Sequence, residues 1–199
     1  MKSAKANIAA WSREIEGEGL DAIVVNASGC GTTIKDYGFL FREDPVWAEK
    51  AAKVSALARD ITELLSELGP LPTVAGERPS IAYHSACSMQ HGQKLDGLPR
   101  RLLREAGFEL HEVAEGHICC GSAGSYNILQ PALAAQLRNR KLANLARSGA
   151  AVVATGNIGC IQQLEEGLDR PILHTVELLD WATGGPRPTS LAPKPEASD

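Results

Sequence analysis

Short apolar segments rich in β-branched residues alternate with longer amphipathic segments along most of this chain. The segments with strand character lie at 22–26, 80–84, 109–113, 151–155 and 171–174. Such alternation favours an α/β fold in which a parallel or mixed sheet is flanked by helices. This pattern constrains the fold strongly, because the carboxyl ends of parallel strands meet at one edge of a sheet.

The amphipathic segments predict three long helices. The first is expected over 45–68, because Asp44 is a favourable N-cap and Pro45 suits the first helical position. The others are expected over 98–106 and 131–148, and a glycine follows each of them. The last helix is basic, and we expect its charged side chains to form a solvated face, with a docking patch as the alternative. These side chains are Arg138, Arg140, Lys141 and Arg147.

A faint internal repeat links two distant segments. GLDAIVVNASGC at 19–30 and GAAVVATGNIGC at 149–160 both place nine residues between a glycine and a Gly-Cys pair. If the repeat is real, the chain holds one complete copy and the end of another. We therefore expect a partial tandem repeat, and a chain that is the C-terminal piece of a longer architecture.

Composition along the chain suggests where its parts divide. The segment 69–79 is rich in Pro and Gly and is expected to connect two domains. The residues before it, 1–68, would be the end of a first repeat, and 80–183 would be a complete cysteine-rich domain. The Pro-rich tail over 184–199 is expected to be disordered.

The cysteines follow the predicted strands. Each of the five lies just past the carboxyl end of a strand-like segment: Cys30, Cys87, Cys119, Cys120 and Cys160. Three loops of one sheet would therefore bring the last four to a shared edge, where ligands bind in open α/β sheets. Gly121 and Gly124 allow the backbone to approach closely there. Four thiolates at such a place are a strong signal for a metal site.

The neighbours Cys119 and Cys120 argue against a disulfide framework. Adjacent Cα atoms are about 3.8 Å apart, whereas unstrained disulfides need roughly 4.4–6.8 Å. The N-terminus lacks the apolar core of a signal peptide, so we expect reduced thiols in a cytoplasmic protein. No apolar run reaches membrane-spanning length, and a net charge of −4 gives no basic signature for nucleic acid.

The residues alone leave several chemistries open. Four cysteine ligands suit an iron–sulfur cluster and also a zinc site. The iron–sulfur cluster is the favoured hypothesis. A metal-free thiol–disulfide enzyme, with Cys119 or Cys120 as nucleophile, is a further alternative. A zinc-stapled structural module is another. The sequence has no glycine-rich dinucleotide fingerprint, so we expect neither FAD nor NAD to bind this chain.

The spacing Cys-x31-Cys-Cys-Gly-x38-Cys resembles the cysteine-rich CCG domain, the family that includes the heterodisulfide reductase B subunit. Over residues 20–182 the chain is similar in more detail to the C-terminal half of glycolate oxidase (glycolate dehydrogenase) iron–sulfur subunits. The segments that carry this resemblance are VVNASGCGTTIKDYG, HSACSMQHG, HICCGSAGSYNILQP, ATGNIGC and LHTVELLDWA.

The resemblance implies an iron–sulfur subunit that passes electrons from a flavin-containing partner subunit toward the quinone pool. FAD would then be bound only by the partner, and this chain would contribute no catalytic residue. The subunit would be cytoplasmic, or peripheral on the inner face of the cytoplasmic membrane.

Two departures from the family pattern matter. The family motif ends in Cys-x-x-Cys, and Asn157 occupies the first of those positions here. With four thiolates left, a [4Fe–4S] cluster is the economical reading. The ferredoxin-like cysteine motifs of the family's N-terminal half do not occur in this sequence.

Polar residues near the cysteines are candidates for tuning the centre. His84 and His91 flank Cys87, His117 precedes Cys119 by two residues, and any of them could donate a hydrogen bond to a cluster sulfur. Asn157 could act likewise. Cys30 corresponds to Cys160 in the repeat, and it is either a further ligand or a remnant thiol.

Overall fold

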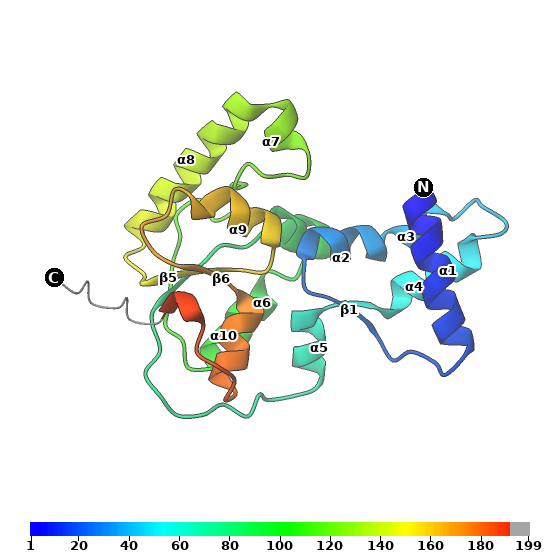
Figure 1. Ribbon diagram of the computed structural model, residues 1–199, viewed down its shortest axis with the longest axis horizontal. Coiled ribbons are helices and arrows are strands. Elements are labelled where there is room, and N and C mark those ends of the chain that lie inside the picture. The colour runs from blue at the N-terminus through cyan, green and yellow to red at the C-terminus, as the bar shows by residue number, and fades with distance from the viewer. Residues whose placement is uncertain (192–199) are drawn as a thin grey trace.

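The computed structural model describes residues 1–191 of the 199-residue chain. Within these residues the strands form two parallel sheets, one with the order β1-β2 and one with the order β4-β3-β5-β6. Helices flank both sheets, so the expected α/β architecture is confirmed. In Figure 1 the N-terminal elements lie to one side of the larger sheet.

The larger sheet contains four strands predicted from the sequence. They are β3 (Ile81–Tyr83), β4 (Leu110–His111), β5 (Val152–Thr155) and β6 (Ile172–His174). The two central strands, β3 and β5, are buried at every position. Continuous apolar strands of this kind are typical of parallel sheets that are covered on both faces.

Alternate residues of these strands contribute to two separate cores. Ile81 and Ala154 face α6 (Gly97–Glu105) and α10 (Thr175–Ala182). Val153 belongs to the opposite core, which includes residues of α8 (Pro131–Arg147) and α9 (Ile158–Glu165). The sheet is therefore a middle layer between two helical layers, and its strand ends are free to carry the loops that hold the cysteines.

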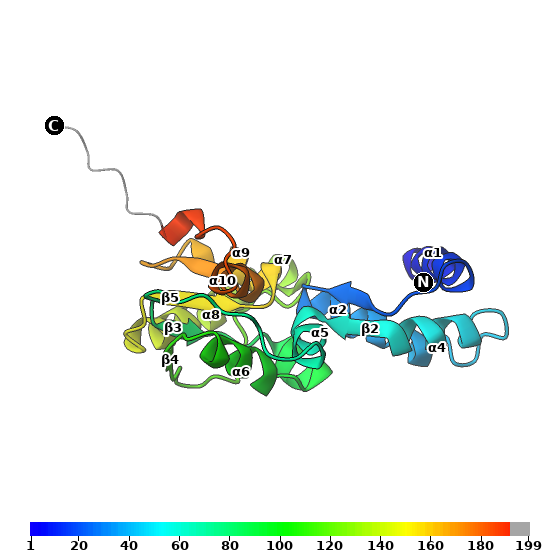
Figure 2. The ribbon, with the colours of Figure 1, turned by 90° about the horizontal axis from the view of Figure 1, so that it is seen from below.

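The N-terminal elements pack around a core of their own. They are α1 (Lys2–Glu16), β1 (Ile23–Val25), α2 (Ser28–Lys35), α3 (Tyr37–Leu40), α4 (Ala48–Leu57) and β2 (Ala58–Asp60). Ile8, Phe41 and Val54 are almost completely buried in this core. The next helix, α5 (Ile61–Glu67), instead packs through Leu65 against the core of the larger sheet that contains α6 and α10. Figure 2 shows α1 and α4 extending away from the larger sheet.

A small hydrogen-bond network joins the N-terminal elements to the larger sheet. Ser28, the first residue of α2, lies 2.7 Å from Ser88 between hydroxyl oxygens, and its carbonyl accepts a 2.9 Å hydrogen bond from Gln93. Both partners belong to η1 (Ser88–Gln93), a π-helical turn. His174 Nε2 lies 2.7 Å from the carbonyl oxygen of Asn26. These bonds fix the start of α2 against the carboxyl edge of the larger sheet.

The predicted helix over 45–68 is wrong in two respects. It is interrupted at Ala58–Asp60, where β2 pairs in parallel with β1. It also begins at Ala48, while Asp44 accepts hydrogen bonds in the preceding turn. Pairing with β1 keeps 58–60 extended, and Asp60 at its end is a favourable N-cap. Its carboxylate accepts a 2.9 Å hydrogen bond from the Thr62 amide and starts a new helix, α5.

The other sequence expectations concern the repeat, the tail and membrane-spanning segments. In both repeat segments a strand leads into a helix whose third residue is the cysteine, Cys30 in α2 and Cys160 in α9. Within the predicted tail, Thr189–Leu191 forms a short 3-10 helix, and 192–199 lies outside the described residues. Across residues 1–191, no helix combines the length and apolarity that crossing a membrane requires.

Replacing Asp60 should test its role as the N-cap of α5. Asp60→Ala removes the capping box of α5 and should lower the free energy of unfolding by about 1 kcal/mol. Urea unfolding followed by circular dichroism measures this change. Asp36→Ala is the matched control, because Asp36 makes no side-chain capping bond. Equal stability of the two variants would contradict the capping role.

Candidate metal centre

The predicted ligand residues lie at the carboxyl edge of the larger sheet. Cys87 follows β3 and directly precedes η1, and Cys160 lies in the first turn of α9, after β5. Cys119 and Cys120 lie in the glycine-containing loop between β4 and α7 (Tyr126–Leu129). Parallel strand geometry thus brings three loops to one place.

These loops enclose a cavity of about 610 Å³. All five cysteines of the chain contribute to its lining: Cys30, Cys87, Cys119, Cys120 and Cys160. Cys120 and Cys160 are buried, Cys87 and Cys119 are partly buried, and Cys30 is exposed. The exposure of the thiols therefore increases across the site, from the two buried cysteines to the others nearer solvent.

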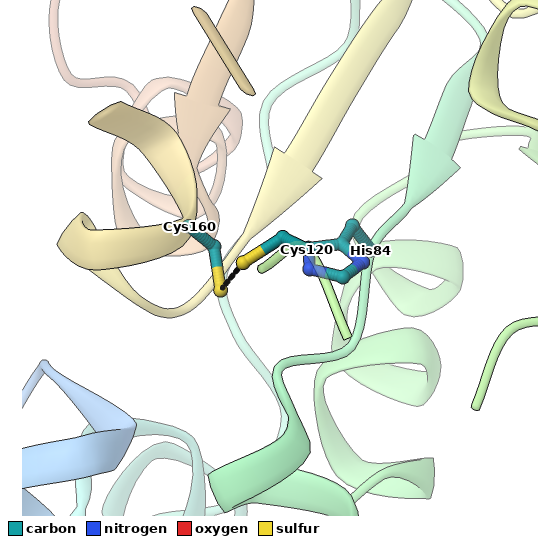
Figure 3. Close-up of side chains that lie close together, drawn as sticks. All are labelled: His84, Cys120 and Cys160. Carbon is teal, nitrogen blue, oxygen red and sulfur yellow. Dashed lines mark hydrogen bonds between the residues drawn. The ribbon is translucent and has the colours of Figure 1, made fainter. Parts of the chain in front are cut away.

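The deepest part of the site combines two thiols with an imidazole. The sulfur atoms of Cys120 and Cys160 are 3.4 Å apart. A ring nitrogen of His84, the residue that follows β3, lies within 4.8 Å of both sulfurs. Figure 3 shows the three side chains close together. Among residues 1–191, neither nitrogen of His84 has a hydrogen-bond partner, although the residue is only 2% exposed.

Because the thiols lie close together, the pKa values of some are lowered and the pKa of another is raised. The neighbouring thiols of Cys120 and Cys87, with the Gly121 amide, lower the pKa of Cys119. The Cys120 thiol and the nearby His84 ring lower the pKa of Cys160. Hydrogen bonding to Cys119 and Cys160, together with burial, raises the pKa of Cys120. Metal binding by the whole set would therefore release protons, since ligating thiols must be deprotonated.

Gly121 allows the cysteine loop to pass close to α8. Its φ is +93°, and a Cβ at this position would collide with the carbonyl oxygen of Ala134. The same backbone turn directs the Gly121 amide to the Cys119 sulfur, at 3.3 Å. Both the positive φ and the close approach therefore require glycine here.

The expectation that the basic residues of α8 form a solvated face is wrong for Lys141. Its side chain is completely buried, and its ammonium donates to the carbonyls of Glu115 and Gly116, at 3.0 and 3.4 Å. Burial lowers the pKa of Lys141. Helical periodicity could have indicated this position, because Lys141 lies four residues before the buried Leu145 and seven after the buried Ala134.

Gln90 was also missed from the sequence, and it connects two of the cysteine loops. Its amide donates to the carbonyl of Ser85, at 2.8 Å, and to that of Gly116, at 3.1 Å. Ser85 precedes Cys87, and Gly116 precedes Cys119. Gln90 and Lys141 therefore fix the backbone of these loops through hydrogen bonds to their carbonyls. No motif signals such a role, because it depends on contacts between loops.

The remaining candidates divide between the cavity and the surface. Asn157 lines the cavity, and its amide donates to the Cys160 sulfur at 3.5 Å. Cys30 also lines the cavity, from α2. His91 and His117 are exposed and lie outside the set of residues that line the cavity.

The donor set fits a metal centre. Thiolates and imidazole are the donors that iron–sulfur clusters and zinc take from proteins. A buried imidazole with two unpaired nitrogens is costly unless something binds it, by about 1–3 kcal/mol for each unsatisfied group. The geometry alone suits iron–sulfur and zinc alike.

Comparison with known proteins agrees with this geometry. Residues 81–165, which contain β3 through α9 and four of the five cysteines, match the cysteine-rich domain called CCG. The matched segment is the one that brings Cys87, Cys119, Cys120 and Cys160 to the cavity.

Individual relatives narrow the comparison. The chain is 41% identical over 184 residues to the glycolate oxidase iron–sulfur subunit of Escherichia coli (strain K12), which is 92% of this chain and 44% of the relative. It is 33% identical over 191 residues to the probable glycolate oxidase iron–sulfur subunit of Bacillus subtilis (strain 168), which is 91% of this chain and 42% of the relative. Lactate utilization protein A of Exiguobacterium sp. is 27% identical over 79% of this chain and 67% of its own length. The chain thus spans less than half the length of the two glycolate oxidase subunits.

Substituting Gly121 should disturb the site through a steric clash. Gly121→Ala should lower the free energy of unfolding by about 1–2 kcal/mol from the positive φ and by about 1–3 kcal/mol more from the collision with Ala134. Thermal unfolding of the metal-free chain measures the loss. Gly124→Ala is the matched control, because Gly124 also has a positive φ but faces open space. If both variants lose the same stability, the clash is not the cause.

Proposed function

We propose that this chain is an electron-transferring, iron–sulfur part of a glycolate-oxidising complex. The observation that carries the proposal is the gathering of Cys87, Cys119, Cys120 and Cys160 around one cavity. The CCG domain match and the similarity to glycolate oxidase iron–sulfur subunits support it.

The four thiolates would hold a [4Fe–4S] cluster, with zinc as the alternative occupant. A bound cluster supplies one-electron redox chemistry. The protein's own contribution is positioning: Gly121 brings the loop to α8, and Gln90 and Lys141 fix the loop backbones. Asn157 would donate a hydrogen bond to a coordinated sulfur and so help to tune its potential.

The partners and the location that go with this function are proposed from the family resemblance. A partner subunit would bind FAD and take the hydride from the 2-hydroxy acid, and electrons would go on toward the quinone pool. The chain would work in the cytoplasm or at the inner face of the cytoplasmic membrane. In this proposal 80–183 is the complete domain, 69–79 is the connector, and 1–68 is the end of a preceding repeat.

Cysteine variants should distinguish the cysteines that bind the cluster from those that do not. After anaerobic reconstitution with ferrous iron and sulfide, Cys119→Ser and Cys120→Ser should lose most of the bound iron and the brown absorbance. Cys30→Ser should keep both, because Cys30 is exposed and comes from α2, outside the elements of the larger sheet. Iron, sulfide and zinc analysis of each purified variant provides the measurement.

Three outcomes would contradict this assignment. An iron-poor Cys30→Ser protein would make Cys30 a ligand. Zinc without sulfide in the anaerobically purified wild-type chain would replace the iron–sulfur proposal with a structural metal site. Iodoacetamide kinetics on metal-free protein would reveal a single hyper-reactive thiol if the chain were a thiol–disulfide enzyme.

The chain alone should not oxidise glycolate. Removal of hydride from a hydroxy acid requires a hydride-accepting cofactor, and the sequence has no dinucleotide fingerprint. Dye reduction by the cluster-loaded chain with glycolate should stay at the level of a metal-free control. Adding the flavin subunit together with a full-length iron–sulfur subunit should restore turnover. Turnover by the isolated chain would overturn the role as an electron carrier.

A further inference from the structure

The two-stranded sheet reproduces part of the larger sheet. In both, a strand leads into a helix whose third residue is a cysteine, Cys30 in α2 and Cys160 in α9. Ile23 of β1 and Val153 of β5 each lie seven residues before that cysteine. Ile23 pairs with the first residue of β2, and Val153 pairs with the first residue of β6. The parallel pairs β1-β2 and β5-β6 therefore have the same register.

The next helices extend this correspondence. Asp60, the last residue of β2, and His174, the last residue of β6, are both N-caps. Each forms a capping box with the glutamate three residues later, Glu63 in α5 and Glu177 in α10. Cysteine position, strand register and helix cap thus agree, so the repeat of the sequence is also a repeat of the structure.

The two units differ on the other side of their first strand. In the larger sheet, β3 pairs with the side of β5 that faces away from β6. There the Val152 amide donates to the Ser80 carbonyl at 3.1 Å, and the Ala154 carbonyl accepts a 2.8 Å hydrogen bond from the His84 amide. In the part of the chain that the structure describes, no strand pairs with the corresponding side of β1. We call this the free side of β1.

The exposure of Val24 agrees with a missing neighbour. Val24 and Ala154 each lie six residues before the cysteine of their unit, yet Val24 is 46% exposed and Ala154 is completely buried. Parallel sheets are normally covered on both faces, and an unpaired strand edge is a template for another strand. By the repeat, the Ala22 amide and the Val24 carbonyl are the groups that such a strand would bond.

We propose that the free side of β1 binds an extended segment of a second polypeptide, which adds as a parallel strand in the place that β3 takes beside β5. The counterpart strand, Ile81–Tyr83, is buried at every position, so the segment should be apolar and uncharged. Strand addition of this kind takes its affinity from main-chain hydrogen bonds.

The lengths of the relatives indicate which polypeptide supplies the strand. More than half of each glycolate oxidase iron–sulfur subunit lies outside the part that this chain matches. That unmatched part is long enough to contain the counterpart of β3, and we commit to a polypeptide equivalent to it as the partner. The inference rests on the preceding repeat included in the proposed function, and it does not depend on the cluster.

The outer side of β2 should not be a second site of this kind. Its counterpart, β6, is the last strand of the larger sheet and has no neighbour on that side among the described residues. The repeat therefore predicts strand addition at β1 alone.

Binding between separate polypeptides tests the proposal. The probe is the part of the Escherichia coli relative outside its matched region, and calorimetry measures its binding to the full chain. Val24→Pro should weaken binding by at least about 10-fold, because proline removes the amide on the free side and obstructs the incoming strand. Val24→Ala is the matched control and should bind like the wild type, because it keeps the amide and alanine occupies this place in β5.

Hydrogen exchange of the wild-type chain keeps the test decisive if Val24→Pro does not fold. The Val24 amide should exchange rapidly in the free chain and at least about 10-fold more slowly when the probe is bound. Slow exchange in the free chain would overturn the proposal, because the free side would then already be paired. A homodimer found by sedimentation would make a second copy of the chain the occupant.

Two binding results would also overturn the proposal. One is the absence of binding to the wild-type chain, and the other is equal binding by Val24→Pro and Val24→Ala. Iron and sulfide analysis keeps these failures apart from failure of the proposed function. A chain that assembles a cluster but does not bind the probe loses only the strand site. A chain that binds the probe through β1 but assembles no cluster loses only the iron–sulfur role.

Discussion

Parallel strand pairing is the constraint on which the site depends. Because β3, β4 and β5 run in the same direction, their carboxyl ends and the loops that follow share one edge of the sheet. Thiols separated by more than 70 residues, such as Cys87 and Cys160, therefore line the same cavity. The two cores on either side of the sheet bury the strands that lead into these loops.

The site also concentrates polar groups that ordinary packing would not leave buried. Over the described residues 1–191, both ring nitrogens of His84 lack a hydrogen-bond partner. The buried ammonium of Lys141 donates to two carbonyls of the cysteine loop. Leaving a buried polar group unsatisfied costs about 1–3 kcal/mol. Such costs are typical of functional sites, where a bound group or a developing charge compensates for them. The ionisation of the cysteines and that of the buried groups around them therefore affect one another.

Much of this arrangement could be predicted from sequence because it follows from local patterns. The buried strands at 80–84 and 151–155 were identified by their β-branched residues, and the order of strands and cysteines gave the shared edge. The interruption at Ala58–Asp60 was hidden inside a helical pattern, since only pairing with β1 makes it a strand. Gln90 and Lys141 could not be assigned roles, because their partners are backbone carbonyls of a distant loop. His84 was recognised as a neighbour of Cys87, but its burial beside Cys120 and Cys160 depends on tertiary structure.

The way α2 reaches the cavity has a consequence for the order of assembly. Cys87, Cys119, Cys120, Cys160 and His84 all belong to elements between β3 and α9, whereas Cys30 comes from the N-terminal elements. The buried donors can therefore come together before Ser28 forms its hydrogen bonds with Ser88 and Gln93. In the proposed centre, metal insertion would be topologically independent of that docking, and α2 would then close one wall of the cavity. The contacts of α2 with η1 would thus bear on how easily small oxidants or chelators reach the cysteines.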